Sequence, residues 1–382
     1  MYQESYNGFE VGPIRPPSEA ASLMLRVTRN CPWNRCKFCS LYKDEKFGMR
    51  SVDHIIRDID AIKKYVDLIT TKASEGEVSL MKLARTVNLS ADDDINAFQA
   101  ALQWMRGGME SVFLQDGNSI IIKPTELETI LLHLKKQFPS IKRVTTYARS
   151  KNLYKMKDKD LAIVAKAGLN RIHIGMESGA DSVLSFVNKG VTKHEQIVAG
   201  QKVKKAGIEL SVYFMPGLGG KMLTEDNALE TADAFNQINP DFIRIRTLAV
   251  PKSVDLYEEV EKGAFTKLND VEVMQELRQF ISHLNDIDSV LKSDHILNLL
   301  QELEGELPKD KADMLDTIDK FLEMKEEDQL VYRVGRRTGI YSRLNDINDV
   351  DLMPHVEYQI RANGVAQHNI NEFTSSMMER FI

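Results

Sequence analysis

The chain has 382 residues, and its 50 Lys plus Arg against 56 Asp plus Glu give a formal net charge of −6. Hydrophobic residues make up 43% and charged residues 28%, which excludes the disordered and fibrous classes. The mildly acidic balance disfavours strong, non-specific binding to nucleic acid, and no apolar run of about 18 residues could span a membrane. We therefore expect a cytoplasmic protein with room for a barrel of roughly 200 to 250 residues and a smaller module.

Taken in chain order, residues 1–20 contain three prolines and are predicted to be an irregular arm. After the arm, short apolar runs alternate with segments of helical periodicity, a rhythm typical of parallel strands joined by right-handed crossovers. The six expected strands are 22–28, 111–116, 143–148, 171–177, 209–215 and 242–248. The expected helices are 52–65, a pair that ends at about 206, and single helices that begin at about 124, 158 and 224.

This rhythm predicts an α/β fold in which residues 21–250 form a partial six-unit barrel with a helical insertion at about 67–100. An open, doubly wound sheet is the alternative, because periodicity does not distinguish the two. Past residue 251 the strand rhythm stops, and long amphipathic stretches follow at 271–291 and 311–322. A mostly helical C-terminal module over 251–382, which could cap the barrel mouth, is therefore expected.

The three cysteines of the chain, Cys31, Cys36 and Cys39, lie within nine positions directly after the first expected strand. An odd, clustered set without a secretory context favours metal ligation over disulfides. Thiolates ligate iron-sulfur clusters, and three thiolates would leave one iron of a 4Fe-4S cubane open to a substrate or cofactor. The alternatives are unremarkable thiols or a zinc site completed by a histidine, although no fourth ligand is adjacent.

The segment CPWNRCKFC, with Phe38 directly before the last cysteine, resembles the cysteine loop of the radical S-adenosylmethionine (SAM) superfamily. The first gap is one residue longer than in the usual signature. The resemblance covers about residues 23–250, and the phrase IGMESGADSVLSFVNKGVT is similar to the tRNA-modifying and coproporphyrinogen-oxidase-like branches. It implies a 4Fe-4S cluster and a bound SAM that is cleaved to methionine and a 5′-deoxyadenosyl radical, in a TIM-like barrel that keeps oxygen away.

The same resemblance implies cofactor contacts at the ends of the strands. Gln115, Asp116 and Gly117 correspond to the motif that receives the amino group of SAM. Glu177 corresponds to the acidic position at the ribose, where a carboxylate can accept both hydroxyl hydrogens. The further cofactor candidates are Phe38, Arg149, Pro216, Gly217, Gly219 and the segment from Leu248 to Val250.

The sequence supports substrate-binding residues less strongly than it supports the cofactor contacts. His173 shares a strand face with Glu177, although a histidine buried in the core is the more common situation. Arg244 and Arg246 alternate on another strand and could bind a carboxylate or phosphate, or form a structural ion pair. Tyr213 and His295 complete the set; His295 belongs to the phrase SDHILNLL, which together with VGRRTGIY stands out in the C-terminal module.

We predict an iron-sulfur enzyme, an oxidoreductase or transferase, whose radical abstracts hydrogen from a small or medium organic substrate. It would need a reducing partner such as flavodoxin or ferredoxin. RNA modification ranks lower because the sequence lacks basic clustering and a recognisable RNA-binding appendage. A carrier that binds SAM without turnover is the third hypothesis. Neither cobalamin chemistry nor an auxiliary cysteine-bound cluster is expected, since the sequence offers no motif for either.

Overall fold

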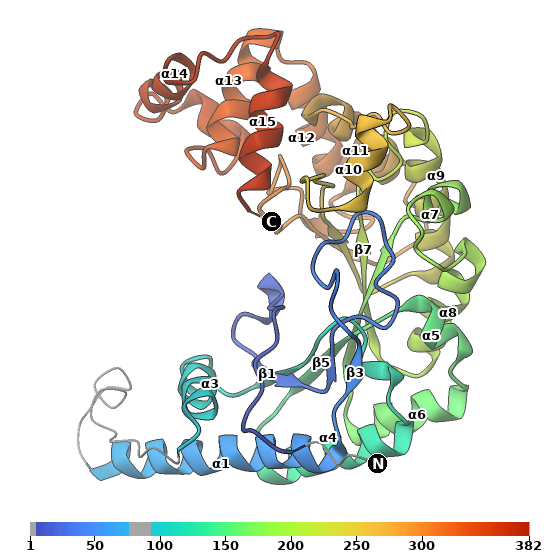
Figure 1. Ribbon diagram of the computed structural model, residues 1–382. Coiled ribbons are helices and arrows are strands. Elements are labelled where there is room, and N and C mark those ends of the chain that lie inside the picture. Colours follow the sequence, from blue (N-terminus) through green and yellow to red (C-terminus); the bar gives the residue numbers. More distant parts are fainter. Residues whose placement is uncertain (1–4, 76–92, 382) are drawn as a thin grey trace. The chain divides into compact units, whose positions relative to one another are not determined.

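The computed structural model describes residues 5–75 and 93–381, which divide into two compact units (Figure 1). The first unit comprises residues 1–32, 44–174 and 202–209. The second unit comprises residues 33–43, 175–201 and 210–382. Both units therefore draw on separate stretches of the sequence.

The first unit is built on parallel strands. Hydrogen-bonded neighbours follow the order β1 (Leu23–Arg26), β4 (Ser111–Gln115), β5 (Arg143–Ala148) and β6 (Arg171–Glu177), whose last residues belong to the second unit. Apolar side chains of these strands, such as Leu25 and Phe113, are fully buried. β1 and β4 carry consecutive apolar residues, as strands covered on both faces require, which explains why these two segments form part of the core.

The helices of the first unit begin and end at residues suited to those positions. α1 (Val52–Glu75) lies beside α3 (Ile95–Arg106) and α4 (Pro124–Gln137) (Figure 1). Asp94 caps α3 by accepting a hydrogen bond from the Ala97 N–H at 2.9 Å. The remaining helical elements are η1 (Pro17–Glu19), η2 (Ser119–Ile121), α5 (Ser150–Lys155) and α6 (Asp158–Ala167).

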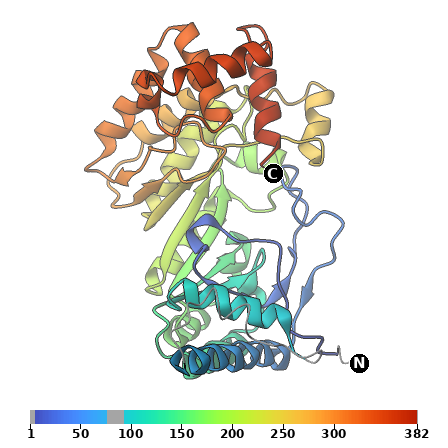
Figure 2. The same cartoon turned by 90° about the vertical axis from the view of Figure 1, so that its left-hand side faces the viewer.

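In the second unit, β7 (Glu209–Phe214), β8 (Phe242–Ile245) and β9 (Val290–Lys292) are parallel neighbours, and β10 (Gly305–Glu306) pairs antiparallel with β9. Helix α13 (Glu326–Arg337) packs against α14 (Met353–Ala362) and α15 (Ile370–Glu379), which are drawn in red in Figure 2. The other helical elements are α7 (Asp181–Phe186), α8 (Lys193–Lys205), α9 (Thr224–Ile238), α10 (Asp255–Glu261), α11 (Asp270–Ser282), α12 (Lys311–Leu322) and η3 (Leu344–Asn348).

The predicted α/β class is confirmed: the strands are mostly parallel and alternate with helices, and the last part of the chain is mainly helical. The six expected strands correspond to β1 and to β4 through β8. The expectation that strands stop after residue 251 is wrong, because β9 continues the parallel order beside β8. With only three residues, β9 is too short to show a period.

Two helices also differ from their expected extent. α1 continues to Glu75, so a regular helix covers the start of the expected insertion, of which residues 76–92 lie outside the described part of the chain. α11 ends at Ser282, where an amphipathic stretch to residue 291 was expected. Among the helices described, none is both long enough and apolar enough to cross a membrane.

The two conspicuous phrases of the C-terminal region contact each other. Arg337 donates a hydrogen bond to the carbonyl of Leu297 at 2.6 Å, and Arg336 donates to the carbonyl of Leu299 at 3.2 Å. Asn298, between these two carbonyls, accepts from the N–H of Thr247 at 2.9 Å. The buried arginines thus hold a loop that is attached to the residues after β8, which gives Arg336 and Arg337 a structural role.

Candidate cofactor site

The cysteine loop lies between two short strands. β2 (Thr28–Arg29) pairs antiparallel with β3 (Gly48–Met49), so the chain from residue 30 to residue 47 is closed at its base. Cys31, Cys36 and Cys39 are partly exposed thiols, without a disulfide. Cys31 belongs to the first unit, whereas Cys36 and Cys39 belong to the second.

The donor chemistry of this loop fits an iron-sulfur cluster. Within residues 5–75 and 93–381, no three His, Cys, Asp or Glu side chains are gathered in an arrangement that could hold a metal ion. Three partly exposed thiols on one loop are nevertheless the donors that a cubane cluster uses. Ligation by all three would require the loop to bring its sulfur atoms together.

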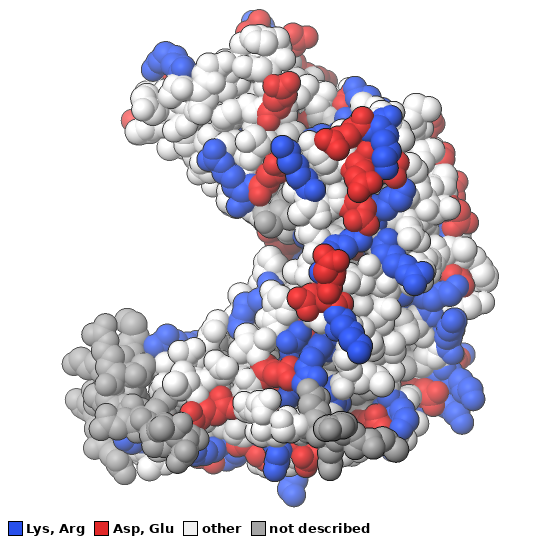
Figure 3. Space-filling view, viewed as in Figure 1, with Lys and Arg blue, Asp and Glu red and all other residues white. Residues whose placement is uncertain are grey.

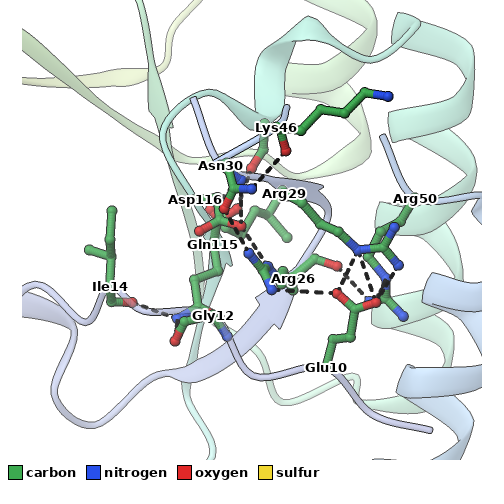
Figure 4. A network of polar contacts seen from close by, with 12 residues as sticks. Glu10, Gly12, Ile14, Arg26, Arg29, Asn30, Lys46, Arg50, Gln115 and Asp116 are labelled. Carbon is green, nitrogen blue, oxygen red and sulfur yellow. Dashed lines mark hydrogen bonds and ion pairs between the residues drawn. The ribbon is translucent and has the colours of Figure 1, made fainter. Parts of the chain in front are cut away.

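The backbone directly before Cys31 is fixed by a polar network in the first unit (Figure 4). Asn30 has a positive φ of 67°, and its side-chain amide donates to the Lys46 carbonyl at 2.8 Å. The Asn30 N–H donates to the carboxylate of Asp116 at 3.3 Å. The same carboxylate is fully buried and accepts from Nε of Arg26 at 2.6 Å. The entrance to the cysteine loop is thereby tied to the end of β4.

The N-terminal arm completes this network. Glu10 accepts hydrogen bonds from Nε of Arg29 at 2.9 and 3.0 Å, and it lies 3.4 Å from Arg50. Burial raises the pKa of Glu10, but the hydrogen bond from Arg29 and the charge of Arg50 outweigh burial and leave the pKa below its usual value. Glu10 is therefore an anion that attaches the arm to the base of the cysteine loop.

Gln115 also binds the arm. Its Oε1 accepts from the Gly12 N–H at 2.9 Å, and its Nε2 donates to the Ile14 carbonyl at 2.6 Å (Figure 4). The side chains of Gln115 and Asp116 are thus engaged within the protein, while Gly117 beside them is partly exposed. Their existing partners make the backbone the better candidate for any contact of these residues with an amino group. The sequence could not show this, because the arm and β4 are about a hundred residues apart.

The middle of the cysteine loop is anchored in the second unit. The indole N–H of Trp33 donates to the Asn188 carbonyl at 2.8 Å, and the Lys37 N–H donates to the Val187 carbonyl at 2.9 Å. Phe38 packs against the apolar cluster that contains Val187 and Leu218. Phe38, next to Cys39, therefore packs against an apolar core, which limits the freedom of the middle of the loop.

Three strand ends in the second unit are joined by backbone hydrogen bonds. The Met215 N–H donates to the carbonyl of Glu177 at 2.8 Å, and the Leu248 N–H donates to the carbonyl of Pro216 at 3.0 Å. These bonds bring together cofactor candidates that lie far apart in the sequence. Gly217 and the segment from Leu248 to Val250 line one hollow of the second unit. Gly219, by contrast, packs its Cα against the carbonyl of Leu223, where a Cβ atom would lie 2.4 Å from the oxygen.

Lys189 is a residue that the sequence reasoning missed. Its Nζ lies 3.2 Å from Oε1 of Glu177 and 5.4 Å from the centre of the Phe38 ring. Gly190 follows with a φ of 71°, and a Cβ atom there would lie 2.3 Å from the ring of Trp33. Lys189 occurs in the same phrase as Glu177, so the phrase contained the signal, but its twelve-residue separation from Glu177 concealed the contact.

His173 lies in the core of the first unit. It is fully buried, with its ring centre 5.5 Å from that of Tyr147 and its Nε2 3.5 Å from the carboxylate of Glu19. Burial raises the pKa of Glu19, but hydrogen bonds from His173 and Ser22 and the charge of Arg143 lower it to about 2. Ser22 and Arg143 mark the N-terminal ends of strands, whereas active sites of such folds lie at the C-terminal ends. This surrounding favours a structural role for His173.

The remaining candidates lie in polar surroundings. Arg244 donates to Asp294 at 2.8 Å and to Ser211 Oγ at 3.2 Å, and it is paired in register with Tyr213 of β7. The described structure thus holds Arg244 in an ion pair. In the first unit, Arg149 precedes α5, and its backbone N–H donates to Oδ1 of Asn118 at 3.0 Å.

His295 and Arg246 are the two remaining substrate candidates. Burial first, and then the charge of Arg246, lower the pKa of His295 to about 4, so the imidazole is neutral at pH 7. The Leu297 N–H donates to Nδ1 of His295 at 3.3 Å, so the proton of the neutral ring resides on Nε2. Arg246 is exposed to solvent. The two side chains together offer a positive charge and a hydrogen-bond donor.

Comparisons with known proteins match parts of the chain. The model of the Radical SAM superfamily matches residues 76–233, a stretch that begins after the cysteine loop. A tRNA uridine(34) acetyltransferase from Methanocaldococcus jannaschii is 25% identical over 119 residues, which are 31% of this chain and 22% of that protein. A 4'-phospho-dehydrooxetanocin synthase from Priestia megaterium is 32% identical over 112 residues, which are 29% of this chain and 14% of that protein.

The matched residues thus span less than a quarter of the length of these curated relatives. Among solved structures, coproporphyrinogen III oxidase (HemN) from Escherichia coli, described as a radical SAM enzyme, is similar with a TM-score of 0.45 and 13% identity. That similarity covers 69% of this chain and 52% of the other.

Proposed function

Because this chain belongs to the radical SAM superfamily of enzymes, which use a 4Fe-4S cluster and SAM, we propose that Cys31, Cys36 and Cys39 are the cluster ligands. The proposed reaction is reductive cleavage of SAM, followed by abstraction of a hydrogen atom from a small or medium organic substrate. The observation that carries the proposal is the set of three partly exposed thiols on one closed loop, next to Phe38. A reducing partner is required, for which flavodoxin or ferredoxin is suited.

When bound, the reduced cluster supplies the electron that cleaves SAM into methionine and the 5′-deoxyadenosyl radical. The protein has to hold SAM in one orientation and exclude water and oxygen. Glu177 is proposed to accept the ribose hydroxyls, because its carboxylate is already oriented by Lys189 at 3.2 Å. The backbone from Leu248 to Val250 is proposed for the adenine, because a hollow lies beside it, and the backbone at Pro216 and Gly217 is proposed to pass close to the cofactor. In the first unit, the backbone at Gln115 to Gly117 is proposed for the amino group, and Arg149 for a carboxylate.

The substrate is proposed to carry an anionic group, either a carboxylate or a phosphate. Arg246 is exposed and His295 is neutral with its Nε2–H available as a donor, a combination that favours an anion over a cation. Arg244 is less suited, because Asp294 already neutralises its charge at 2.8 Å. The Priestia megaterium relative is named for a phosphorylated product, which agrees with this class of ligand.

The decisive experiment reconstitutes the protein anaerobically with iron and sulfide, reduces it with dithionite and adds SAM. We expect a paramagnetic cubane in the reduced protein and formation of 5′-deoxyadenosine. Cys36→Ala and Cys39→Ala should each lose most of the cluster iron, because two thiolates cannot hold a cubane with one open iron. Ser40→Ala is the matched control, since it changes the residue next to Cys39 without removing a sulfur atom.

The outcomes separate the hypotheses. A cluster that forms and binds SAM without releasing 5′-deoxyadenosine above background would contradict turnover and favour the carrier that binds SAM without cleaving it. A cluster that is retained in Cys36→Ala would contradict the ligand assignment. An intact cluster that binds no SAM would contradict both hypotheses.

RNA modification is the second candidate function, because a relative in Methanocaldococcus jannaschii is named as a tRNA uridine(34) acetyltransferase. The charge of this chain does not favour it: on the face shown in Figure 3, Lys and Arg are interspersed with Asp and Glu, and the net charge is −6. Retention of bulk tRNA on a filter at low salt, lost at high salt, would support this candidate. Absence of any retention at low salt would remove it.

A further inference from the structure

Glu276 on α11 is a buried carboxyl group that contacts the cofactor-side backbone of the second unit. Its side chain is 2% exposed. Oε1 accepts hydrogen bonds from the Gly217 N–H at 2.9 Å and from the side-chain amide of Asn227 at 2.8 Å. Oε2 is hydrogen-bonded to the hydroxyl of Thr224. One carboxyl group thus connects α11, the first turns of α9 and the chain that leaves β7.

The chain that Glu276 holds is a tight turn. Gly217 has a φ of 86°, in the left-handed region that favours glycine, and its carbonyl accepts from the Gly220 N–H at 3.0 Å. The preceding carbonyl, that of Pro216, accepts from the Leu248 N–H at 3.0 Å. Because the Gly217 N–H donates to Glu276, the orientation of the Pro216–Gly217 peptide is set from both sides: by Leu248 at its carbonyl and by Glu276 at its nitrogen.

We propose that Glu276 is a positioning residue for SAM: it orients the turn at Gly217 so that the backbone from Met215 to Gly217 can lie against the cofactor. This inference rests on the proposed function, which assigns that backbone to SAM. Glu276 itself does not line the hollow formed by Gly217 and Leu248, so its effect on SAM passes through the turn. A displaced peptide there would lose close backbone contacts, which depend on geometry to within a fraction of an ångström.

The hydrogen bonds of Glu276 indicate which substitution preserves the turn. Oε1 must keep its lone pairs, because it accepts from two N–H donors. The hydroxyl of Thr224 can either donate or accept, so Oε2 can carry a proton without losing its partner. Gln at this position can therefore reproduce all three contacts, with its amide N–H donating to Thr224. Leu has a similar size and reproduces none of them.

The test compares SAM dissociation constants, measured by calorimetry on reconstituted protein of equal cluster content. Glu276→Leu is expected to weaken SAM binding at least about tenfold, whereas Glu276→Gln should stay within about threefold of the unsubstituted protein. Glu225→Leu and Glu225→Gln are the matched controls: Glu225 is exposed on α9 next to Thr224 and should leave the affinity unchanged. Rescue by Gln distinguishes a requirement for these hydrogen bonds from a requirement for a negative charge.

Hydrogen exchange of the amides from residue 215 to residue 220, measured without SAM, provides an independent readout. Exchange should be faster in Glu276→Leu and unchanged in Glu276→Gln. If Glu276→Leu does not fold, Glu276→Asp replaces it, since the shorter side chain keeps a carboxyl group but cannot reach Gly217. SAM affinity equal to that of the unsubstituted protein in the Leu or Asp variant would overturn the proposal. If unsubstituted, cluster-loaded protein binds no SAM, the proposed function fails, a result distinct from failure of the Glu276 variants.

Discussion

Nζ of Lys189 lies 3.2 Å from Oε1 of Glu177, and both side chains are almost buried. The same ammonium group lies 5.4 Å from the ring centre of Phe38, next to Cys39. Lys189 thereby connects the carboxylate proposed for the ribose of SAM with the aromatic residue of the cysteine loop. An ammonium ion can interact with a carboxylate and an aromatic face at the same time.

We expect Lys189→Met to weaken SAM binding by about tenfold, because Glu177 loses the ion pair that orients its carboxylate. Lys189→Arg should retain most of the affinity, since a guanidinium can contact both partners. Calorimetry at equal cluster content measures the effect. Lys193→Met is the control, because Lys193 is similarly buried but pairs with Glu230 and Asp233 instead. Equal affinities of Lys189→Met and Lys193→Met would contradict the prediction.

Removing Arg26 should destabilise the protein. In Arg26→Met, the fully buried carboxylate of Asp116 loses its ion-pair partner at 2.6 Å, and removing one side of a buried ion pair costs on the order of 3 kcal/mol. Arg57→Met removes an exposed pair with Asp53 at 3.6 Å and should change the free energy of unfolding by less than about 0.5 kcal/mol. Urea denaturation followed by circular dichroism compares them. Equal midpoints for the two variants would show that Asp116 does not depend on Arg26.

The titration of Glu276 should be visible in the stability of the protein. Burial raises its pKa from 4.5 to about 7, against smaller lowering effects from Thr224, Gly217 and Asn227. The folded protein therefore keeps this proton up to about pH 7, whereas the unfolded chain releases it near pH 4.5. The resulting stabilisation is complete below pH 4.5 and is lost as the pH rises through about 7.

Between pH 5 and pH 8, the unsubstituted protein should therefore lose on the order of 3 kcal/mol of unfolding free energy relative to Glu276→Gln. Subtracting the unfolding free energies of the two proteins removes the contributions that other charged groups make to both. Among these groups are Lys221, Glu225 and Glu272, which line the hollow beside Glu276. Denaturation curves at several pH values measure it. A difference that is independent of pH would mean that Glu276 does not change its protonation in this range.

A methyl group at Gly12 should release the N-terminal arm. A Cβ atom there would lie 2.8 Å from the side-chain amide of Gln115, so Gly12→Ala forces apart two groups that are hydrogen-bonded at 2.9 Å. We expect a loss of about 1 to 3 kcal/mol and faster proteolysis of the arm. Gly48→Ala is the control, because its Cβ would meet nothing closer than 3.9 Å. Unchanged proteolysis in Gly12→Ala would contradict this role of Gln115.

Arg246 and His295 should respond to the same anion. Burial is the main cause of the low pKa of His295, and Arg246→Gln removes the second cause, a positive charge, so that pKa should rise above about 4. Histidine NMR, with the signal assigned through His295→Asn, measures the change. In the unsubstituted protein, inorganic phosphate should shift this signal, and the shift should be smaller in Arg246→Gln. If phosphate leaves the His295 signal in place, the proposed anionic substrate group loses its support.

Sequence alone was sufficient for the α/β class and for the candidate cluster ligands. β1 and the strands from β4 to β8 follow from apolar runs and turn residues, signals that lie within a few residues of one another. Cys31, Cys36 and Cys39 are likewise close in the chain, so their spacing was readable before any fold was known. Signals of this kind depend only on residues that are close together along the chain, so they can be read from the sequence directly.

Only the tertiary structure decided which polar side chains contact each other. Glu276 reaches Gly217 across 59 residues, and Gln115 reaches Gly12 across 103. Likewise, β9 is recognised as a strand only through its parallel pairing with β8. Such contacts depend on how helices and strands pack, because a buried polar group takes whichever partner the fold brings within hydrogen-bonding distance. No local pattern in the chain encodes that choice.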